Sequence, residues 1–260
     1  MPDASVRSLT VAADGEPLAF PGRVRLSGRD ALSLFPALFT LTLWNLPDPL
    51  YLALSRCRTL SVSRGDACLA AGTVSDVYRQ ETASGTAAFV AFSRGLALWE
   101  ARVSLSVPAG APVSDTVSRI LEASGLSVPL LSFPGTDPVF SRPQAFSGRA
   151  AECVEAALSA ASARAAWTER GLRVIPSGGL APSMTLTEAD LLSPPAFVGG
   201  VLRGAPERMI LSARLRGWRP GDTVSVRYGE LSAAGIIEER GIDADTGGGP
   251  WASEMVLRTV

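Results

Sequence analysis

Short apolar runs that alternate with polar residues and stop at turn residues occupy both ends of the chain, and this pattern restricts it to a mainly β fold. The clearest run is 39–44, where Phe39, Leu41 and Leu43 share one face of an extended chain and two threonines lie on the other. Such a density of strands and turns is typical of a small barrel or sandwich. No helix longer than a turn or two is expected before residue 108. The other strands expected in this part are 23–27, 59–63, 71–78, 87–93 and 97–107.

In the middle of the chain the apolar residues recur with a different period. Apolar residues recur with helical spacing over 113–121, and Gly125 is placed to end that helix. A second, alanine-rich helix is expected over 147–164, with Ser147 as its N-cap. A hairpin over 165–175 follows, with a turn near its centre.

Strand signals return after residue 179, which indicates a second β unit. The Arg219–Asp222 sequence, Arg-Pro-Gly-Asp, has the residues that a type II turn requires. We therefore predict a mainly β fold with a small α+β insert: two small β-barrel domains, 1–108 and 179–260, flank a helix-plus-hairpin domain, 109–178. The strands expected in the second unit are 184–187, 197–202, 208–213, 223–228, 232–238 and 253–259.

Composition excludes most polar catalysis. All 24 basic residues are arginine, because the sequence contains no lysine and no histidine. Relays that use histidine, imidazole metal ligands, a phosphate-loop lysine and Schiff bases are therefore impossible. The three cysteines form no C-x-x-C pair, and Glu152 and Glu155 fit a solvated helix face rather than an acid–base pair. We expect no catalytic residue, no metal site, no cofactor and no enzyme activity.

Charge and hydropathy limit the partners. The net charge is −1, so the whole molecule exerts no attraction on phosphates. Residues 1–7 lack the order of a signal peptide, and no run of about 18 apolar residues occurs, so membrane insertion is not expected. We interpret Trp218, which lies between Arg216 and Arg219 at a turn, as a partly exposed residue at an interface that includes both arginines.

Five parts of the chain carry a resemblance to a known family: 39–46 (FTLTLWNL), 72–77 (GTVSDV), 103–115 (VSLSVPAGAPVSD), 146–148 with Trp167, and 215–224 (LRGWRPGDTV). Their order resembles the tail hub, or baseplate hub, proteins of tailed bacteriophages, including the Mu-like baseplate and late-control-D types. Two departures concern Arg94-Gly95, where an acidic residue more often precedes the glycine, and 215–218, where a Leu-Asn-Pro-like stretch is common.

This resemblance implies a homotrimer in which two barrels per subunit form a pseudo-sixfold ring. The ring would join a hexameric tail tube protein to a trimeric central spike protein and would surround a channel. DNA would pass through without sequence-specific binding, and a tape-measure protein is a further partner. The location implied is the virion tail baseplate, after synthesis in the host cytoplasm. The alternative from the residues alone is a β-sandwich carbohydrate-binding, adhesin-like module, and a carboxylate-dependent wall hydrolase is a third.

Overall fold

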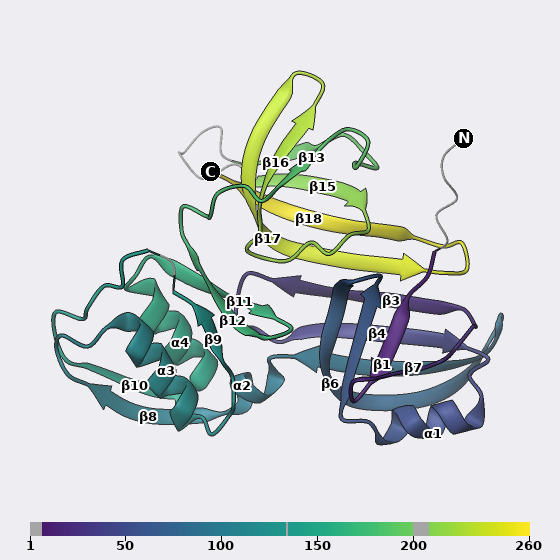
Figure 1. The fold of residues 1–260 in the computed structure, drawn as a ribbon, viewed down its shortest axis with the longest axis horizontal. Coiled ribbons are helices and arrows are strands. Elements are labelled where there is room, and N and C mark those ends of the chain that lie inside the picture. The colour runs from purple at the N-terminus through teal and green to yellow at the C-terminus, as the bar shows by residue number, and fades with distance from the viewer. Residues whose placement is uncertain (1–6, 134, 200–207) are drawn as a thin grey trace.

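The computed structural model describes residues 7–133, 135–199 and 208–260, and most of them form strands (Figure 1). The helices are α1 (Asp48–Arg56), α2 (Leu96–Glu100), α3 (Val113–Ala123) and α4 (Ala150–Ser159). The strands up to α3 are β1 (Thr10–Ala13), β2 (Glu16–Pro17), β3 (Val24–Ala31), β4 (Ala37–Trp44), β5 (Thr59–Arg64), β6 (Ala67–Thr82), β7 (Gly85–Arg94) and β8 (Arg102–Val107). The later strands are β9 (Leu130–Ser132), β10 (Gln144–Arg149), β11 (Ala163–Thr168), β12 (Gly171–Pro176), β13 (Met184–Leu186), β14 (Ala196–Val198), β15 (Arg208–Arg214), β16 (Thr223–Tyr228), β17 (Leu231–Asp245) and β18 (Trp251–Thr259).

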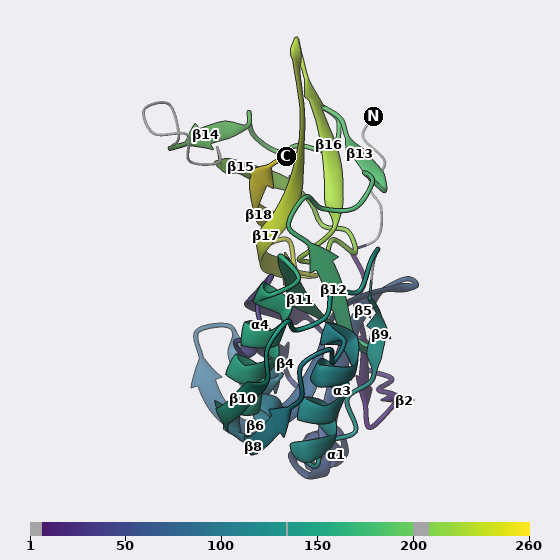
Figure 2. The ribbon, with the colours of Figure 1, turned by 90° about the vertical axis from the view of Figure 1, so that its left-hand side faces the viewer.

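One continuous sheet joins the two ends of the chain. Its strand order is β14-β15-β18-β17-β3-β4-β7-β6-β5-β1-β2, and β16 and β13 branch from β17. The long strand β17 pairs with β16 through its first half and with β3 through its second half, and a bulge near Glu239 separates the halves. Figure 2 shows the β16–β17 hairpin extending away from the helices, with β14 and β13 on opposite sides.

The mainly β class is confirmed, but the two predicted barrels are not found. Among the described strands, the hydrogen-bonded path has two free ends, β14 and β2, and does not close. The physical reason is that β17 and β3 use their edges to pair with each other. The predicted strand 197–202 corresponds to β14 as far as residue 198, and its residues 200–202 lie outside the described residues.

Two expectations for the first part of the chain are wrong. The first is that this part contains no helix longer than a turn or two. The nine-residue helix α1 follows β4, with Asp48 and a proline in its first turn and buried Leu54 against the sheet. The expected strand 97–107 is instead α2 followed by β8, and β8 pairs with β10. Because Val103 and Val107 pack in the core of the helical unit, β8 goes with the middle of the chain. The domain division at 108 and 178 stays a prediction, and this packing favours an earlier start for the middle unit.

The middle unit packs α3 and α4 against short strands. Helix α3 and its end near Gly125, which has a φ of +72°, are as predicted. The hairpin is also confirmed, because β11 pairs with β12 over its whole length. Ser147 is not an N-cap: it lies inside β10, and α4 begins only at Ala150. The strand continues through Ser147 because β10 is held by six residue pairs with β8.

Candidate assembly surface

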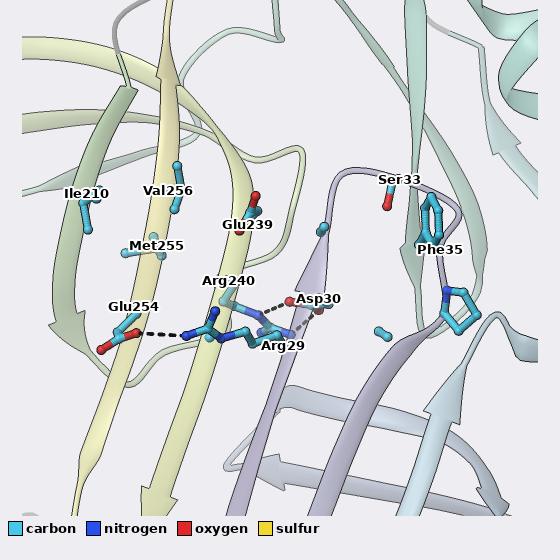
Figure 3. A pocket seen from close by; sticks show the side chains of 14 residues that line it. Arg29, Asp30, Ser33, Phe35, Ile210, Glu239, Arg240, Glu254, Met255 and Val256 are labelled. Carbon is cyan, nitrogen blue, oxygen red and sulfur yellow. Dashed lines mark hydrogen bonds and ion pairs between the residues drawn. The ribbon is translucent and has the colours of Figure 1, made fainter. Parts of the chain in front are cut away.

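A buried ion pair fixes the place where the two ends of the chain meet. Arg240 of β17 and Asp30 of β3 lie opposite each other, and both side chains are almost fully buried. The guanidinium donates two hydrogen bonds to the carboxylate, at 2.8 Å from Nε and 2.5 Å from Nη2 (Figure 3). It also donates to the backbone carbonyls of Leu69 in β6 and Trp218. One side chain therefore ties together two strands of the first β unit, β17 and the segment before β16.

The opposite face of the sheet is exposed and crosses from one β unit to the other. The pairing of five strands places Ala196, Ile210, Val256, Glu239 and Ala31 in one row across β14, β15, β18, β17 and β3. Because side chains alternate along each strand, this row lies on the face opposite to Arg240. This exposed side is called the outer face below.

The outer face carries a series of cross-strand ion pairs. Arg25 and Asp243 approach to 2.8 Å, and Arg29 and Glu254 lie 3.9 Å apart. Asp245, which is almost fully buried, accepts two hydrogen bonds from the guanidinium of Arg23, and these hydrogen bonds lower its pKa. These pairs add to the pairing of β3 with the strands around it, although exposed pairs contribute at most about 1 kcal/mol each.

Two adjoining cavities follow the outer face where it meets the β3–β4 loop. The first, of about 300 Å³, has a wall of Ile210 and Val256 facing Phe35, as Figure 3 shows. The second, of about 450 Å³, shares Phe35 and Glu239 with the first and extends toward α4 and β11. Together the two cavities form a groove between the sheet and the middle unit.

Apolar side chains around this groove are exposed to an unusual degree. Phe35 is 60% exposed, Leu38 66%, Val198 50% and Ile210 43%. Val198 belongs to β14, which forms an end of the strand order among the described residues. Clustered exposed apolar groups and an unpaired strand edge are features that proteins cover with a partner. These four residues are called the assembly surface below.

Glu238 connects the middle unit to the C-terminal strands. Its carboxylate, which is 11% exposed, lies 3.1 Å from Arg164 of β11, 3.5 Å from Arg208 of β15 and 3.2 Å from Arg258 of β18. Three arginines from three strands thus share one carboxylate. Glu155 of α4 connects the middle unit to the β3–β4 loop, because it accepts a hydrogen bond of 2.7 Å from the backbone N–H of Leu34. The sequence analysis expected Glu155 on a solvated helix face. That expectation is wrong for Glu155, because α4 packs against the β3–β4 loop.

The predicted exposure of Trp218 is wrong. Its side chain is 1% exposed and lies in the core of the C-terminal strands, and its indole N–H donates to the carbonyl of Arg214. The turn after it is as predicted: Asp222 N–H donates to the carbonyl of Arg219, and Gly221 has a φ of +87°. The ring is buried because it belongs to the same apolar cluster as Met209, Val224 and Leu257 of the surrounding strands.

The two arginines beside Trp218 form contacts within the chain. Arg216 pairs with Asp190, and Arg219 lies 2.9 Å from Glu169 of the middle unit. A role for Arg216 and Arg219 between subunits stays a prediction. Sequence reasoning missed the assembly surface, although Leu38 gave a signal: it falls on the polar side of the strand that contains Phe39.

The described residues contain no group of three or more acidic, cysteine or histidine side chains that could hold a metal ion. Within the same part of the chain, no helix is long and apolar enough to cross a membrane.

Comparisons with known proteins find similar structures but no similar sequence. No protein-family model matches the chain, and no curated protein matches it. A tail protein from Neisseria meningitidis superposes with a TM-score of 0.72 at 12% identity over 96% of both chains. The 43 kDa tail protein of prophage MuSo2 from Shewanella oneidensis gives 0.68 at 9% identity, over 96% of this chain and 97% of that one.

A third similar structure comes from a secretion machine. The E. coli c3393 protein, described as a component of the type VI secretion system with structural similarity to the T4 tail proteins gp27 and gp5, gives a TM-score of 0.64 at 13% identity. That match covers 96% of this chain and 76% of the other. The chain therefore shares its fold with phage tail proteins and with a related secretion component.

Proposed function

We propose that this protein is a non-catalytic hub of a phage tail baseplate or of a related contractile injection machine. It acts as a homotrimeric adaptor between the hexameric tail tube protein and the trimeric central spike protein, and it surrounds the channel for DNA and the tape-measure protein. The fold shared with tail proteins supports this proposal. Its location is then the virion baseplate, after synthesis in the host cytoplasm.

The observation that carries the proposal is the continuous sheet through β3 and β17. An adaptor that transmits force along a tail must hold its two β units in one fixed relation. Eleven strands in one hydrogen-bonded order, locked by the Arg240–Asp30 pair, provide that rigidity. The sheet also presents an outer face that crosses from one β unit to the other, which three copies would turn into a ring surface.

The assembly surface supports self-association. Phe35, Leu38, Val198 and Ile210 expose apolar area that a soluble monomer normally covers. A specific contact between subunits needs about 1,000 Å² or more of buried surface. The assembly surface, together with the edge of β14 that is unpaired among the described residues, is suited to supply part of it.

Light scattering of the purified chain tests the trimer. The expected mass is three times the 27.1 kDa of one chain. Ile210→Arg should shift the protein toward monomer, because it places a charge on the assembly surface. Leu52→Arg on α1, at a residue that is 49% exposed and outside that surface, is the matched control and should leave the mass unchanged. A monomer at every concentration, with no threefold rings in electron micrographs, contradicts the proposal.

A further inference from the structure

A cavity on the other side of the molecule has a charge imbalance at its base. It measures about 770 Å³ and lies between β5 and β6 of the first β unit and the β11–β12 turn of the middle unit. Its walls include Leu60, Val128 and Pro129, and three charged residues line it: Arg94, Glu169 and Arg170. Mostly apolar walls with a few polar groups are typical of a binding site of this size.

Arg94 lacks a counter-ion. Its Nε donates to the carbonyl of Ala71 at 2.9 Å, and within the described part of the chain no carboxylate lies within ion-pair distance of its guanidinium. Burial lowers the pKa of Arg94, because the charged form has lost water around it. A largely buried guanidinium without an anion is costly, and proteins rarely keep one.

The two nearest acidic groups are already engaged. Asp30 gives both of its oxygens to Arg240, and Glu169 pairs with Arg219 at 2.9 Å. Arg94 and Arg240 therefore share a region of the interior that holds one carboxylate for two guanidinium groups. One positive charge is left without a partner at the base of the cavity.

A second unsatisfied group lies in the same wall. The buried indole N–H of Trp167 has no hydrogen-bond acceptor among the residues that the structure describes. It packs on Gly95, where a Cβ atom would lie only 2.5 Å from the indole nitrogen, so glycine is needed beside Arg94. The ring of Trp167 lines the cavity, which makes it a natural reporter of anything bound there.

We propose that this cavity binds a carboxylate, which pairs with Arg94 and restores the missing negative charge. The planar guanidinium of Arg94 can donate parallel hydrogen bonds to a carboxylate, and Glu169 in the same lining repels a phosphate dianion more strongly than a singly charged carboxylate. The apolar walls favour an acidic side chain of a partner's peptide segment, whose neighbouring residues would contact Val128 and Pro129. This inference concerns the isolated chain and holds whether or not the chain forms trimers.

The test follows the Trp167 indole resonance in ¹H–¹⁵N spectra, assigned with Trp167→Phe. The probes are the blocked peptide acetyl-Leu-Asp-Leu-amide, its asparagine counterpart, glutarate and inorganic phosphate. We expect the aspartate peptide to shift the resonance in a saturable way and the asparagine peptide to leave it in place. This pair of peptides tests the carboxylate on the unaltered protein. If glutarate binds at least as tightly as the peptide, the source is a free carboxylate.

Variants then test the role of Arg94. Arg94→Gln should weaken carboxylate binding roughly tenfold or more, the effect of losing one charge-assisted hydrogen bond. Arg227→Gln, an exposed arginine of β16 outside the cavity, is the matched control and should bind normally. The proposal fails if no carboxylate probe shifts the resonance up to ~10 mM, a concentration that would reveal millimolar affinity. It also fails if Arg94→Gln binds as well as the unaltered chain, or if phosphate binds more tightly than every carboxylate.

Discussion

Replacing Asp30 with asparagine should destabilise the protein strongly. The change removes the carboxylate that pairs with the buried guanidinium of Arg240 and that also attracts the guanidinium of Arg94. Loss of one partner from a buried ion pair costs about 3–5 kcal/mol, because the remaining charge stays in the interior. The upper half of that range is expected here, because the Asp30 carboxylate also attracts the guanidinium of Arg94 without pairing with it. Arg240→Met should cost less than Asp30→Asn, because Arg94 remains near Asp30 as a counter-charge.

Urea unfolding, followed by tryptophan fluorescence and circular dichroism, measures these changes as shifts of the transition midpoint. The double variant Asp30→Asn/Arg240→Met should be less destabilised than the sum of the two single variants, because it leaves no unpaired charge from the original pair. Asp66→Asn, at an exposed residue before β6, is the control and should change stability by less than about 0.5 kcal/mol. A cost below about 1 kcal/mol for Asp30→Asn, the range of a surface pair, would refute the reasoning.

Three further predictions concern other parts of the molecule. Glu238→Gln should lower the urea midpoint and make it rise with added salt, because three arginines lose their shared carboxylate; an unchanged midpoint at low salt contradicts this. Asp245 has a lowered folded-state pKa, so its contribution to stability is complete above the unfolded value of about 4 and is lost as the pH falls through the folded value. The urea midpoint should therefore fall as the pH is lowered from about 5 to 3, and it should fall less in Asp245→Asn than in the unaltered protein. Gly72→Ala should separate β6 from β7, because the new Cβ would lie 2.2 Å from the carbonyl oxygen of Ser93; a normal melting temperature would show that the strands can adjust.

Local sequence patterns were sufficient to predict an element where that element's own residues determine its conformation. Helix α3 follows from apolar spacing between a proline start and a glycine end, and both features act within a few residues. The Arg219–Asp222 turn follows in the same way, because proline fixes one backbone angle and Gly221 supplies a positive one. The mainly β class follows from period-two alternation, which reports that one face of a strand is buried.

Other local signals were present and were outweighed. Asp48 and the proline after it are acceptable in the first turn of a helix, so the residues that seemed to end β4 also begin α1. Ser147 is a good N-cap residue, yet pairing with β8 holds it in a strand. In each case the tertiary partner decided between two conformations that the local sequence allows.

The alternating pattern of each strand came from the sequence, but which strands pair came only from the tertiary structure. Asp30 and Arg240 are 210 residues apart, and nothing in either segment identifies the other. Alternation tells which face of a strand is buried, because that depends on nearest neighbours along the chain. It does not tell which edge meets which, because backbone hydrogen bonds are the same for every strand, and so it could not reveal one open sheet in place of two barrels.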